Sequence, residues 1–163
     1  MARIDDLIEL AARVGNLLRE KGWTLSTAES CTGGLVGHLI TEIPGSSDYF
    51  VGGVVAYANE VKRDLLGVSQ ELLTVHGAVS CQVAAAMARG VRELLGTDLG
   101  IAVTGIAGPT GWTPEKPVGT VYIGLASPTS TQVEHYVWAA DRKGNKLLSA
   151  KAALVLLERQ LTR

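Results

Sequence analysis

Thr27-Ala-Glu-Ser-Cys-Thr-Gly-Gly34 is the segment from which the architecture of this chain can be worked out. Residues 24–28 have the composition of a short strand, and residues 31–42 carry apolar side chains at helical spacing. The segment is therefore predicted to turn from a strand into a helix. Backbone N–H groups at a helix start have no partner within the helix and favour negative charge. A phosphate, a carboxylate or a developing oxyanion would suit this position.

Further strands and helices follow from apolar periodicity and from turn signals. Strands are predicted at residues 51–57, 99–103, 118–126 and 132–139. Helices are predicted at residues 4–21, 59–66, 69–75, 80–95 and 141–161, with Asn59, Ser80 and Asp141 as expected N-caps. Residues 104–117 form a long loop rich in Gly and Pro, and loops of this length are usually functional or disordered.

The order of these elements predicts an α/β fold. The first three strands alternate with helices, which favours parallel neighbours joined by right-handed crossovers. The last two strands are separated by Ser127-Pro-Thr-Ser130 and are predicted to form a hairpin, which adds an antiparallel member. We therefore expect a three-layer α/β/α sandwich with a mixed, mostly parallel five-stranded sheet. One domain is expected to cover residues 1–163.

Composition limits the possible partners. Of the 163 residues, 47% are hydrophobic and 19% are charged, which indicates a folded domain and not a disordered chain. The net charge is −1 without clustered Lys and Arg, so stable nucleic-acid binding is not expected. No apolar segment is long enough to cross a bilayer, and the N-terminus lacks the apolar core of a signal peptide. Cys31 and Cys81 form no disulfide framework, so we expect a cytoplasmic protein without a membrane partner.

Three of the predicted strands end beside residues that could form one reactive site. Ser30 follows the first strand. Tyr57 ends the second strand and precedes Lys62 in the next helix, and Thr104-Gly105 follow the third strand. The carboxyl ends of parallel strands meet at one sheet edge, where open α/β sheets bind ligands. A Ser nucleophile needs a base, and a Lys whose pKa is lowered can act as one.

Simpler roles for these residues are open at this point. Ser30 could be only the N-cap of the following helix. Lys62 could be a solvated helix residue, and Tyr57 could be a packing residue at a strand end. Cys31 could instead be a thiolate at the helix start, although a small buried Cys is the more common case.

Three further features bear on ligand binding. No His pairs with acidic residues at metal-ligand spacing, so no metal site is predicted. Trp112 in the long loop could cover a bound ring or dock on a neighbouring subunit. Arg142, at the start of the last helix, could bind a phosphate through two parallel hydrogen bonds or pair with a carboxylate.

Several motifs of this chain resemble, in the same order, those of the CinA C-terminal domain family, which includes nicotinamide-nucleotide amidohydrolase. The resemblance runs from about residue 7 to the C-terminus and implies a bacterial cytosolic enzyme. Such an enzyme would hydrolyse the carboxamide of nicotinamide mononucleotide, giving nicotinic acid mononucleotide and ammonia. The motifs are Thr27-Ala-Glu-Ser-Cys-Thr-Gly-Gly34, Tyr57-Ala-Asn-Glu-Val-Lys62, His76-Gly-Ala-Val-Ser80, Thr104-Gly-Ile-Ala-Gly-Pro109 and Lys116-Pro-Val-Gly-Thr120.

The resemblance also implies roles for the matching residues. Ser30 would attack the carboxamide carbon while Lys62, tuned by Tyr57, takes its proton, and water would then cleave the acyl-enzyme. No cofactor and no metal are implied, and the implied partners are a small-molecule nucleotide and a second copy in a homodimer. Many relatives carry an N-terminal pyrophosphatase domain, an activity that we expect to be absent here. Oxyanion and substrate contacts are expected from Cys31, Thr32, Gly33, Gly34, Asn59, Thr104, Gly105 and Arg142.

Three positions depart from the pattern of the family. Cys81 stands where relatives often have Glu, Trp112 where they often have Gly, and Lys146 where they often have a second Arg. Lys keeps the positive charge but loses the paired donors of Arg, which bears on the affinity for substrate. Two other functions stay open: a non-catalytic nucleotide- or partner-binding module linked to competence and DNA repair, and an amidase for another small amide.

Overall fold

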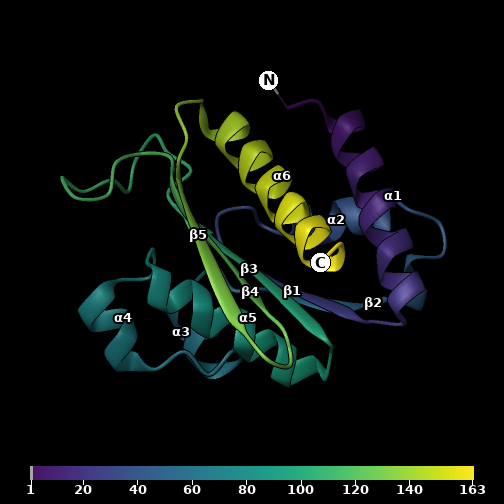
Figure 1. The fold of residues 1–163 in the computed structure, drawn as a ribbon. Coiled ribbons are helices and arrows are strands. Elements are labelled where there is room, and N and C mark those ends of the chain that lie inside the picture. The colour runs from purple at the N-terminus through teal and green to yellow at the C-terminus, as the bar shows by residue number, and fades with distance from the viewer. Residues whose placement is uncertain (1) are drawn as a thin grey trace.

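The computed structural model describes residues 2–163, and Met1, with which the predicted domain begins, lies outside them. Helices and strands alternate up to residue 64, after which two further helices, three consecutive strands and a last helix follow (Figure 1). The elements are α1 (Ile4–Lys21), β1 (Leu25–Glu29), α2 (Leu35–Thr41), the 3₁₀ turn η1 (Ser46–Asp48), β2 (Phe50–Val55), α3 (Asn59–Asp64), α4 (Gln70–His76), α5 (Cys81–Leu95), β3 (Leu99–Gly105), β4 (Thr120–Ala126), β5 (Thr131–Val137) and α6 (Arg142–Leu161).

The strands form one mixed sheet in the order β2-β1-β3-β4-β5. β1 pairs in parallel with β2 and β3, whereas β4 pairs antiparallel with β3 and β5. At the end of β1, Glu29 is in register with Val55 of β2 on one side and with Val103 of β3 on the other. The C-terminal ends of the three parallel strands therefore lie side by side.

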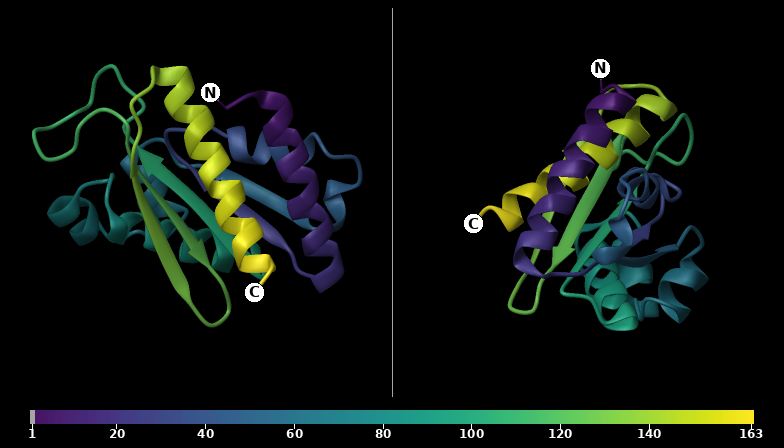
Figure 2. Two further views of the ribbon diagram at one scale, coloured as in Figure 1. Left: turned by 45° about the horizontal axis from the view of Figure 1, so that its top comes forward. Right: turned by 90° about the vertical axis from the view of Figure 1, so that its right-hand side faces the viewer.

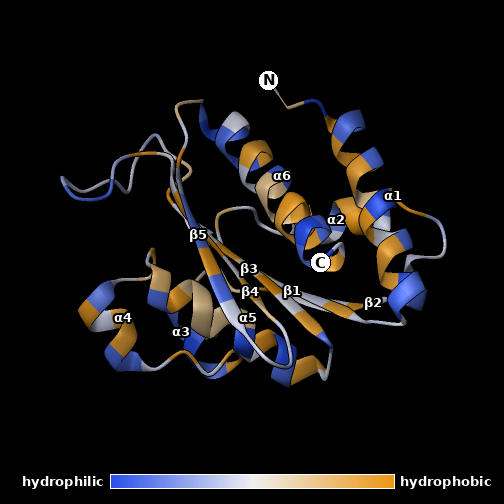
Figure 3. Ribbon diagram, viewed as in Figure 1, coloured by the Kyte–Doolittle hydropathy of each residue, from blue (hydrophilic) through white to orange (hydrophobic). Residues whose placement is uncertain are grey.

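Helices cover both faces of the sheet (Figures 1 and 2). α1, α2 and α6 pack on one face, and α3, α4 and α5 pack on the other, each set around its own apolar core. Figure 3 shows hydrophilic positions in β5, at the edge of the sheet, and a mixture of apolar and hydrophilic positions in α1 and α6. In α1 the buried side chains recur at helical spacing, which is the amphipathic pattern of a surface helix. The predicted α/β/α sandwich with a mixed five-stranded sheet is confirmed.

Three of the described helices, α4, α5 and α6, follow a residue whose side chain accepts a backbone N–H. The side chain of Ser80 accepts the Val83 N–H, and that of Asp141 accepts the Gly144 N–H, so both predicted N-caps are confirmed. The prediction for Asn59 is wrong, because Asn59 is the first residue of α3 and Ala58 precedes it as the cap.

The predicted start of the second helix at residue 31 is also wrong. α2 begins at Leu35, and the residues from Cys31 to Gly34 form a turn. Gly33 and Gly34 have φ values of 62° and 100°, in the left-handed region that a right-handed helix excludes. These two glycines therefore delay the helix and leave Ser30 outside it.

The long loop and the hairpin are found where they were predicted. β4 and β5 pair from Thr120–Val137 at one end to Ala126–Thr131 at the other. Among residues 2–163, no helix combines the length and the apolar character needed to cross a membrane.

Candidate active site

A cavity of about 320 Å³ lies at the C-terminal ends of β1, β2 and β3. Its volume is within the range, about 300–1,000 Å³, of small-molecule sites in proteins. Its position is the sheet edge at which open α/β folds bind ligands. Thr32, Gly33 and Gly34 do not line it. The predicted site residues that do are Ser30, Cys31, Tyr57, Asn59, Lys62, Thr104, Gly105 and Arg142.

Ser30 and Lys62 are in direct contact at the base of this cavity. The Lys62 Nζ lies 3.1 Å from the Ser30 Oγ. Lys62 is 1% exposed and Ser30 is 8% exposed. The same Nζ donates to the carbonyl oxygens of Ala56, at 2.7 Å, and of Tyr57, at 3.0 Å. Lys62 forms no salt bridge with any residue between 2 and 163.

This environment favours the neutral form of Lys62. Burial lowers the pKa of its ammonium, since the charged form loses its hydration without gaining a carboxylate partner. A neutral amine has two N–H donors and one lone pair. The two carbonyl oxygens accept the two N–H groups, and the lone pair is then available for the Ser30 hydroxyl proton. The arrangement is that of a Ser next to its general base.

Tyr57 contacts Lys62 through its peptide carbonyl and not through its phenol. Its side chain is 61% exposed, and its hydroxyl lies 3.5 Å from Nη2 of Arg142. The contact of Tyr57 with Lys62 is thus a main-chain contact, while the Tyr57 phenol lies near Arg142 at the start of α6.

The turn after β1 holds Ser30 in place through its backbone. The Ser30 N–H donates to the Val103 carbonyl at 2.9 Å, and the Ser30 carbonyl accepts the Gly33 N–H at 3.1 Å. Ser30 is not the N-cap of α2, because Gly34 occupies that position and the helix begins beyond it. Its hydroxyl contacts Lys62 instead.

The carboxylate of Glu29, the last residue of β1, binds the N–H groups at the start of α2, a role that the sequence prediction missed. This buried carboxylate accepts the N–H groups of Val36, at 2.8 Å, and Gly37, at 3.0 Å, and the hydroxyl of Thr32 at 2.7 Å. The carboxylate thus occupies the first N–H groups of α2 itself, which lie beyond the Cys31 to Gly34 segment from which oxyanion contacts are expected. A carboxylate inside an apolar strand directly before a helix is the signal that could have revealed this role.

Two backbone N–H groups follow Ser30 in the turn, and of these two residues only Cys31 lines the cavity. Those of Cys31 and Thr32 have no acceptor within residues 2–163. The thiol of Cys31 has a different character, because burial raises its pKa to about 12. It stays protonated at neutral pH, so the thiolate alternative is not supported.

The remaining wall of the cavity comes from the loop after β3 and from α6. The Thr104 hydroxyl donates to the Ala78 carbonyl at 2.7 Å. The Arg142 Nη1 donates to the Gly108 carbonyl at 2.6 Å and thereby joins α6 to this loop. The amide nitrogen of Asn145 donates to the Ala107 carbonyl at 3.0 Å. Asn145 was missed, although a buried Asn in a helix is itself a signal of a specific contact.

The three departures from the family pattern lie in different places. Cys81 is exposed at the first position of α5. Trp112 is exposed in the long loop. Lys146 lines a second cleft, which adjoins the cavity. Within residues 2–163 no group of three or more His, Cys, Asp or Glu side chains is placed to hold a metal ion.

Comparison with known proteins identifies the family. The sequence model of the CinA C-terminal domain matches residues 7–161. This chain is a member of the CinA C-terminal domain family. Among curated relatives, a CinA-like protein of Synechocystis sp. is 56% identical over 155 residues, and one of Geobacter sulfurreducens is 52% identical over 161 residues. These matches cover 93% and 99% of this chain but only 37% and 38% of the relatives, so the chain spans well under half of their length.

Solved structures of the same family have the same fold. The competence/damage inducible protein CihA of Agrobacterium tumefaciens is 41% identical with a TM-score of 0.93, over 97% of this chain and 96% of that one. The competence damage-inducible protein A (ComA) of Klebsiella pneumoniae is 35% identical, also with a TM-score of 0.93, over 96% of this chain and 98% of that one. The CinA-family fold therefore extends over nearly all of this chain.

Proposed function

We propose that this CinA-family domain is an amidohydrolase that deamidates nicotinamide mononucleotide to nicotinic acid mononucleotide and ammonia. One observation carries the proposal: a buried Lys without a carboxylate partner lies 3.1 Å from the hydroxyl of a Ser in a ligand-sized cavity. The nucleotide substrate itself rests on the resemblance to the family.

In the first half of the reaction, the Ser30 Oγ attacks the carboxamide carbon and Lys62 takes the hydroxyl proton. The N–H group of Cys31, which directly follows Ser30 and lines the cavity, is the proposed donor to the oxyanion that forms. The tetrahedral intermediate then collapses. Its C–N bond breaks, Lys62 returns the proton to the leaving nitrogen, and ammonia departs from an ester on Ser30.

In the second half, a water molecule attacks the ester carbon and Lys62 takes a proton from that water. The bond to the Ser30 Oγ breaks, Lys62 returns the proton to the Oγ, and the carboxylic acid that forms releases its remaining proton to solvent and leaves as a carboxylate. The guanidinium of Arg142 at the mouth of the cavity suits the phosphate of the nucleotide, since Arg pairs with phosphate through parallel hydrogen bonds. No metal or cofactor takes part in this scheme.

Release of ammonia from nicotinamide mononucleotide by the purified protein tests the proposal. Ser30→Ala is expected to lower kcat by at least about 10³-fold, because loss of a nucleophile costs more than loss of a single oxyanion donor. Ser26→Ala is a matched control, since Ser26 is buried on β1, the strand that precedes Ser30, and bonds Thr97 outside the cavity. Equal activity in the wild type and Ser30→Ala would exclude Ser30 as the nucleophile.

The same assay separates the other candidate functions. A non-catalytic nucleotide-binding module would bind the nucleotide without turnover and would be indifferent to Lys62→Ala. An amidase for another substrate would be silent with nicotinamide mononucleotide but active on a different member of a panel of small amides, with the same loss in Ser30→Ala.

A further inference from the structure

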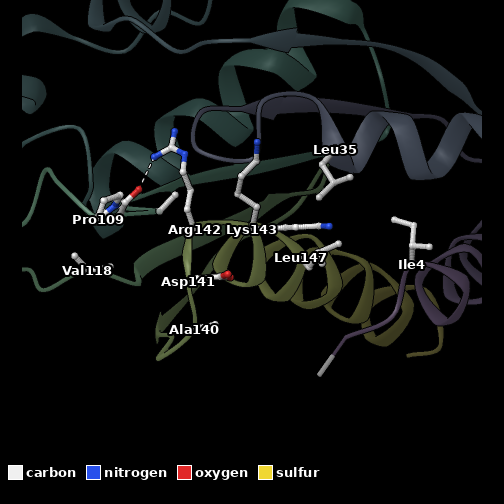
Figure 4. A pocket seen from close by; sticks show the side chains of 12 residues that line it. Ile4, Leu35, Pro109, Val118, Ala140, Asp141, Arg142, Lys143 and Leu147 are labelled. Atoms are coloured by element: carbon white, nitrogen blue, oxygen red, sulfur yellow. Dashed lines mark hydrogen bonds between the residues drawn. The ribbon is translucent and has the colours of Figure 1, made fainter.

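Two side chains near the start of α6 bind consecutive carbonyl oxygens of the loop after β3. The Asn145 Nδ2 donates to the Ala107 carbonyl at 3.0 Å, and the Arg142 Nη1 donates to the Gly108 carbonyl at 2.6 Å. Figure 4 shows Arg142 reaching from α6 to this loop, with a dashed line for its hydrogen bond. Ala107 and Gly108 both line the active-site cavity. α6 therefore determines the position of one wall of that cavity.

The backbone leaves the sheet at Ala107, so the position of this residue depends on Asn145. Ile106, the residue before it, is still bound to the sheet. Its N–H and its carbonyl each form a 2.8 Å hydrogen bond with backbone groups of residues 119–120. The Ala107 carbonyl is bound by the Asn145 amide instead. Asn145 therefore sets the plane of the peptide that joins Ala107 to Gly108.

The side chain of Asn145 is held in one orientation. It is 1% exposed, and its Oδ1 accepts the Ala140 N–H at 3.1 Å while its Nδ2 donates to the Ala107 carbonyl. A flipped amide would place two donors together at Ala140 and two acceptors together at Ala107. The site thus requires an acceptor and a donor on one short side chain, which neither an ionised Asp nor a Leu supplies.

The Gly108 N–H points away from α6. The peptide between Ala107 and Gly108 is trans, and in a planar trans peptide the C=O and N–H bonds point in opposite directions. The Ala107 carbonyl faces Asn145 on α6, so the Gly108 N–H faces the side where Asn59 and Lys62 of α3 line the cavity. This N–H has no acceptor within residues 2–163.

We infer that Asn145 is a positioning residue, which aims the Gly108 N–H at the carbonyl oxygen of the substrate. The inference rests on the proposed amidohydrolase function. Attack by Ser30 turns that oxygen into an oxyanion, and the Gly108 N–H then adds a second donor to that of Cys31. A donor fixed in place before the reaction stabilises the oxyanion without reorganisation as the charge develops. Asn145 thus acts on kcat through the loop and does not touch the substrate.

Ammonia release by two variants of α6 tests this role. Asn145→Leu keeps the approximate size of the side chain and removes the donor to Ala107. It is expected to lower kcat at least about tenfold and to change KM less than about threefold, because the lost contact is strongest in the transition state. Ser149→Ala is the matched control, since Ser149 is buried one turn further along α6 and binds Trp138 but not the loop. A kcat in Asn145→Leu equal to that in Ser149→Ala would overturn the inference.

A fluorophosphonate tests the same role without the nucleotide. The Ser30 Oγ displaces fluoride from phosphorus while Lys62 takes the hydroxyl proton, and the phosphonyl oxygen of the adduct takes the place of the oxyanion. The amide proton of Gly108 is expected to move downfield in the NMR spectrum of the adduct. The amide of Gly96, which follows α5 and lines neither large cavity, should not move. Asn145→Leu should be labelled at least about tenfold more slowly than the wild type.

The two assays separate this inference from the proposed function. Labelling without ammonia release would refute the proposed substrate, and the labelling rates would still decide the role of Asn145. Ammonia release together with an unshifted Gly108 amide in the adduct, or with equal labelling rates in the wild type and Asn145→Leu, would overturn the inference and uphold the function. A Ser30 that reacts with neither compound would overturn both.

Discussion

At the scale of single residues, the chemistry of this site depends on the environment of Lys62. Buried cations in proteins are normally paired, because the free energy of an unpaired buried charge is high. Lys62 has two carbonyl oxygens and a hydroxyl around its Nζ and no carboxylate within the described part of the chain. The fold therefore sets the pKa of this Lys below its ordinary value, which is what a general base requires.

The lowered pKa of Lys62 predicts how stability depends on pH. Between the pKa of Lys62 in the folded state and its ordinary value of about 10.4, the unfolded chain binds one more proton than the folded chain. The contribution of Lys62 to the free energy of unfolding therefore rises with pH across this window, by at most about 1.4 kcal/mol per pH unit, and is lost as pH falls through it. Urea unfolding at several pH values would measure it.

Lys62→Met is the variant for this test, because it removes the titrating group and keeps an unbranched side chain. The free-energy difference between the wild type and Lys62→Met should grow in favour of the wild type as pH rises through the window. The exposed Lys151→Met is the control and should show no such trend. Parallel pH profiles for the wild type and Lys62→Met would contradict a lowered pKa.

Cys31 is predicted to be dispensable for turnover, although it lies next to Ser30. Burial raises the pKa of its thiol to about 12, so almost no thiolate exists at neutral pH. Cys31→Ala should therefore keep most of the kcat/KM of the wild type, measured by ammonia release. A loss comparable to that of Ser30→Ala would instead assign the nucleophile to the thiol.

At the scale of elements, the site depends on a turn that keeps Ser30 out of a helix. Gly33 and Gly34 adopt left-handed conformations, and the Glu29 carboxylate binds the first N–H groups of α2. Ser30 is thus released from capping and free to contact Lys62. One acid and two glycines, all within four residues of Ser30, set the local geometry of this proposed nucleophile.

Two adjacent glycines in β2 give a prediction about this edge of the sheet. A Cβ at Gly53 would overlap the Thr27 hydroxyl oxygen on β1, whereas a Cβ at Gly52 would find its nearest atom, on Leu95, at 3.6 Å. Gly53→Ala should lower the free energy of unfolding by about 1–3 kcal/mol, because the added Cβ would have to displace Thr27. Gly52→Ala should change it by less than about 0.5 kcal/mol. Thermal unfolding compares them, and equal effects would contradict the described register of β1 and β2.

Helix starts that depend on a cap by a nearby side chain could be predicted from the sequence. Ser80 and Asp141 cap helices as expected, because a cap is a contact over three residues. The start of α2 was wrong, since apolar spacing alone does not report that Gly33 and Gly34 take left-handed conformations. The contact of Lys62 with Ser30 spans 32 positions and could be predicted only as a shared sheet edge. Asn145 was missed because its partner, the Ala107 carbonyl, carries no side-chain signal.

At the scale of the whole molecule, the C-terminal ends of the parallel strands bring residues from distant parts of the chain to one cavity. Ser30 follows β1, Lys62 lies in α3 after β2, and Arg142 begins α6. Arg142 closes the cavity by bonding the Gly108 carbonyl, so α6 contributes to the site as well as to the core. Binding of a nucleotide should therefore raise the free energy of unfolding of the whole domain.

Ligand binding can be measured separately from turnover in Ser30→Ala. Nicotinamide mononucleotide at about 100 times its Kd should raise the free energy of unfolding of this variant by about 2.7 kcal/mol. Adding Arg142→Gln should remove much of this effect, since the phosphate loses a bidentate partner. Lys151→Gln on the exposed side of α6 is the matched control. A melting temperature that the nucleotide leaves unchanged in Ser30→Ala would contradict binding of this nucleotide.

The pH dependence of kcat/KM for ammonia release tests most directly the central claim, that neutral Lys62 takes the proton of Ser30. Deprotonation of Lys62 creates the base, so the rate should rise with pH through a single ionisation whose pKa lies below the ordinary value of about 10.4 for Lys. Lys62→Met should abolish this ionisation together with most of the activity. A rate that is independent of pH where the protein is folded, or one that Lys62→Met leaves intact, would contradict the account.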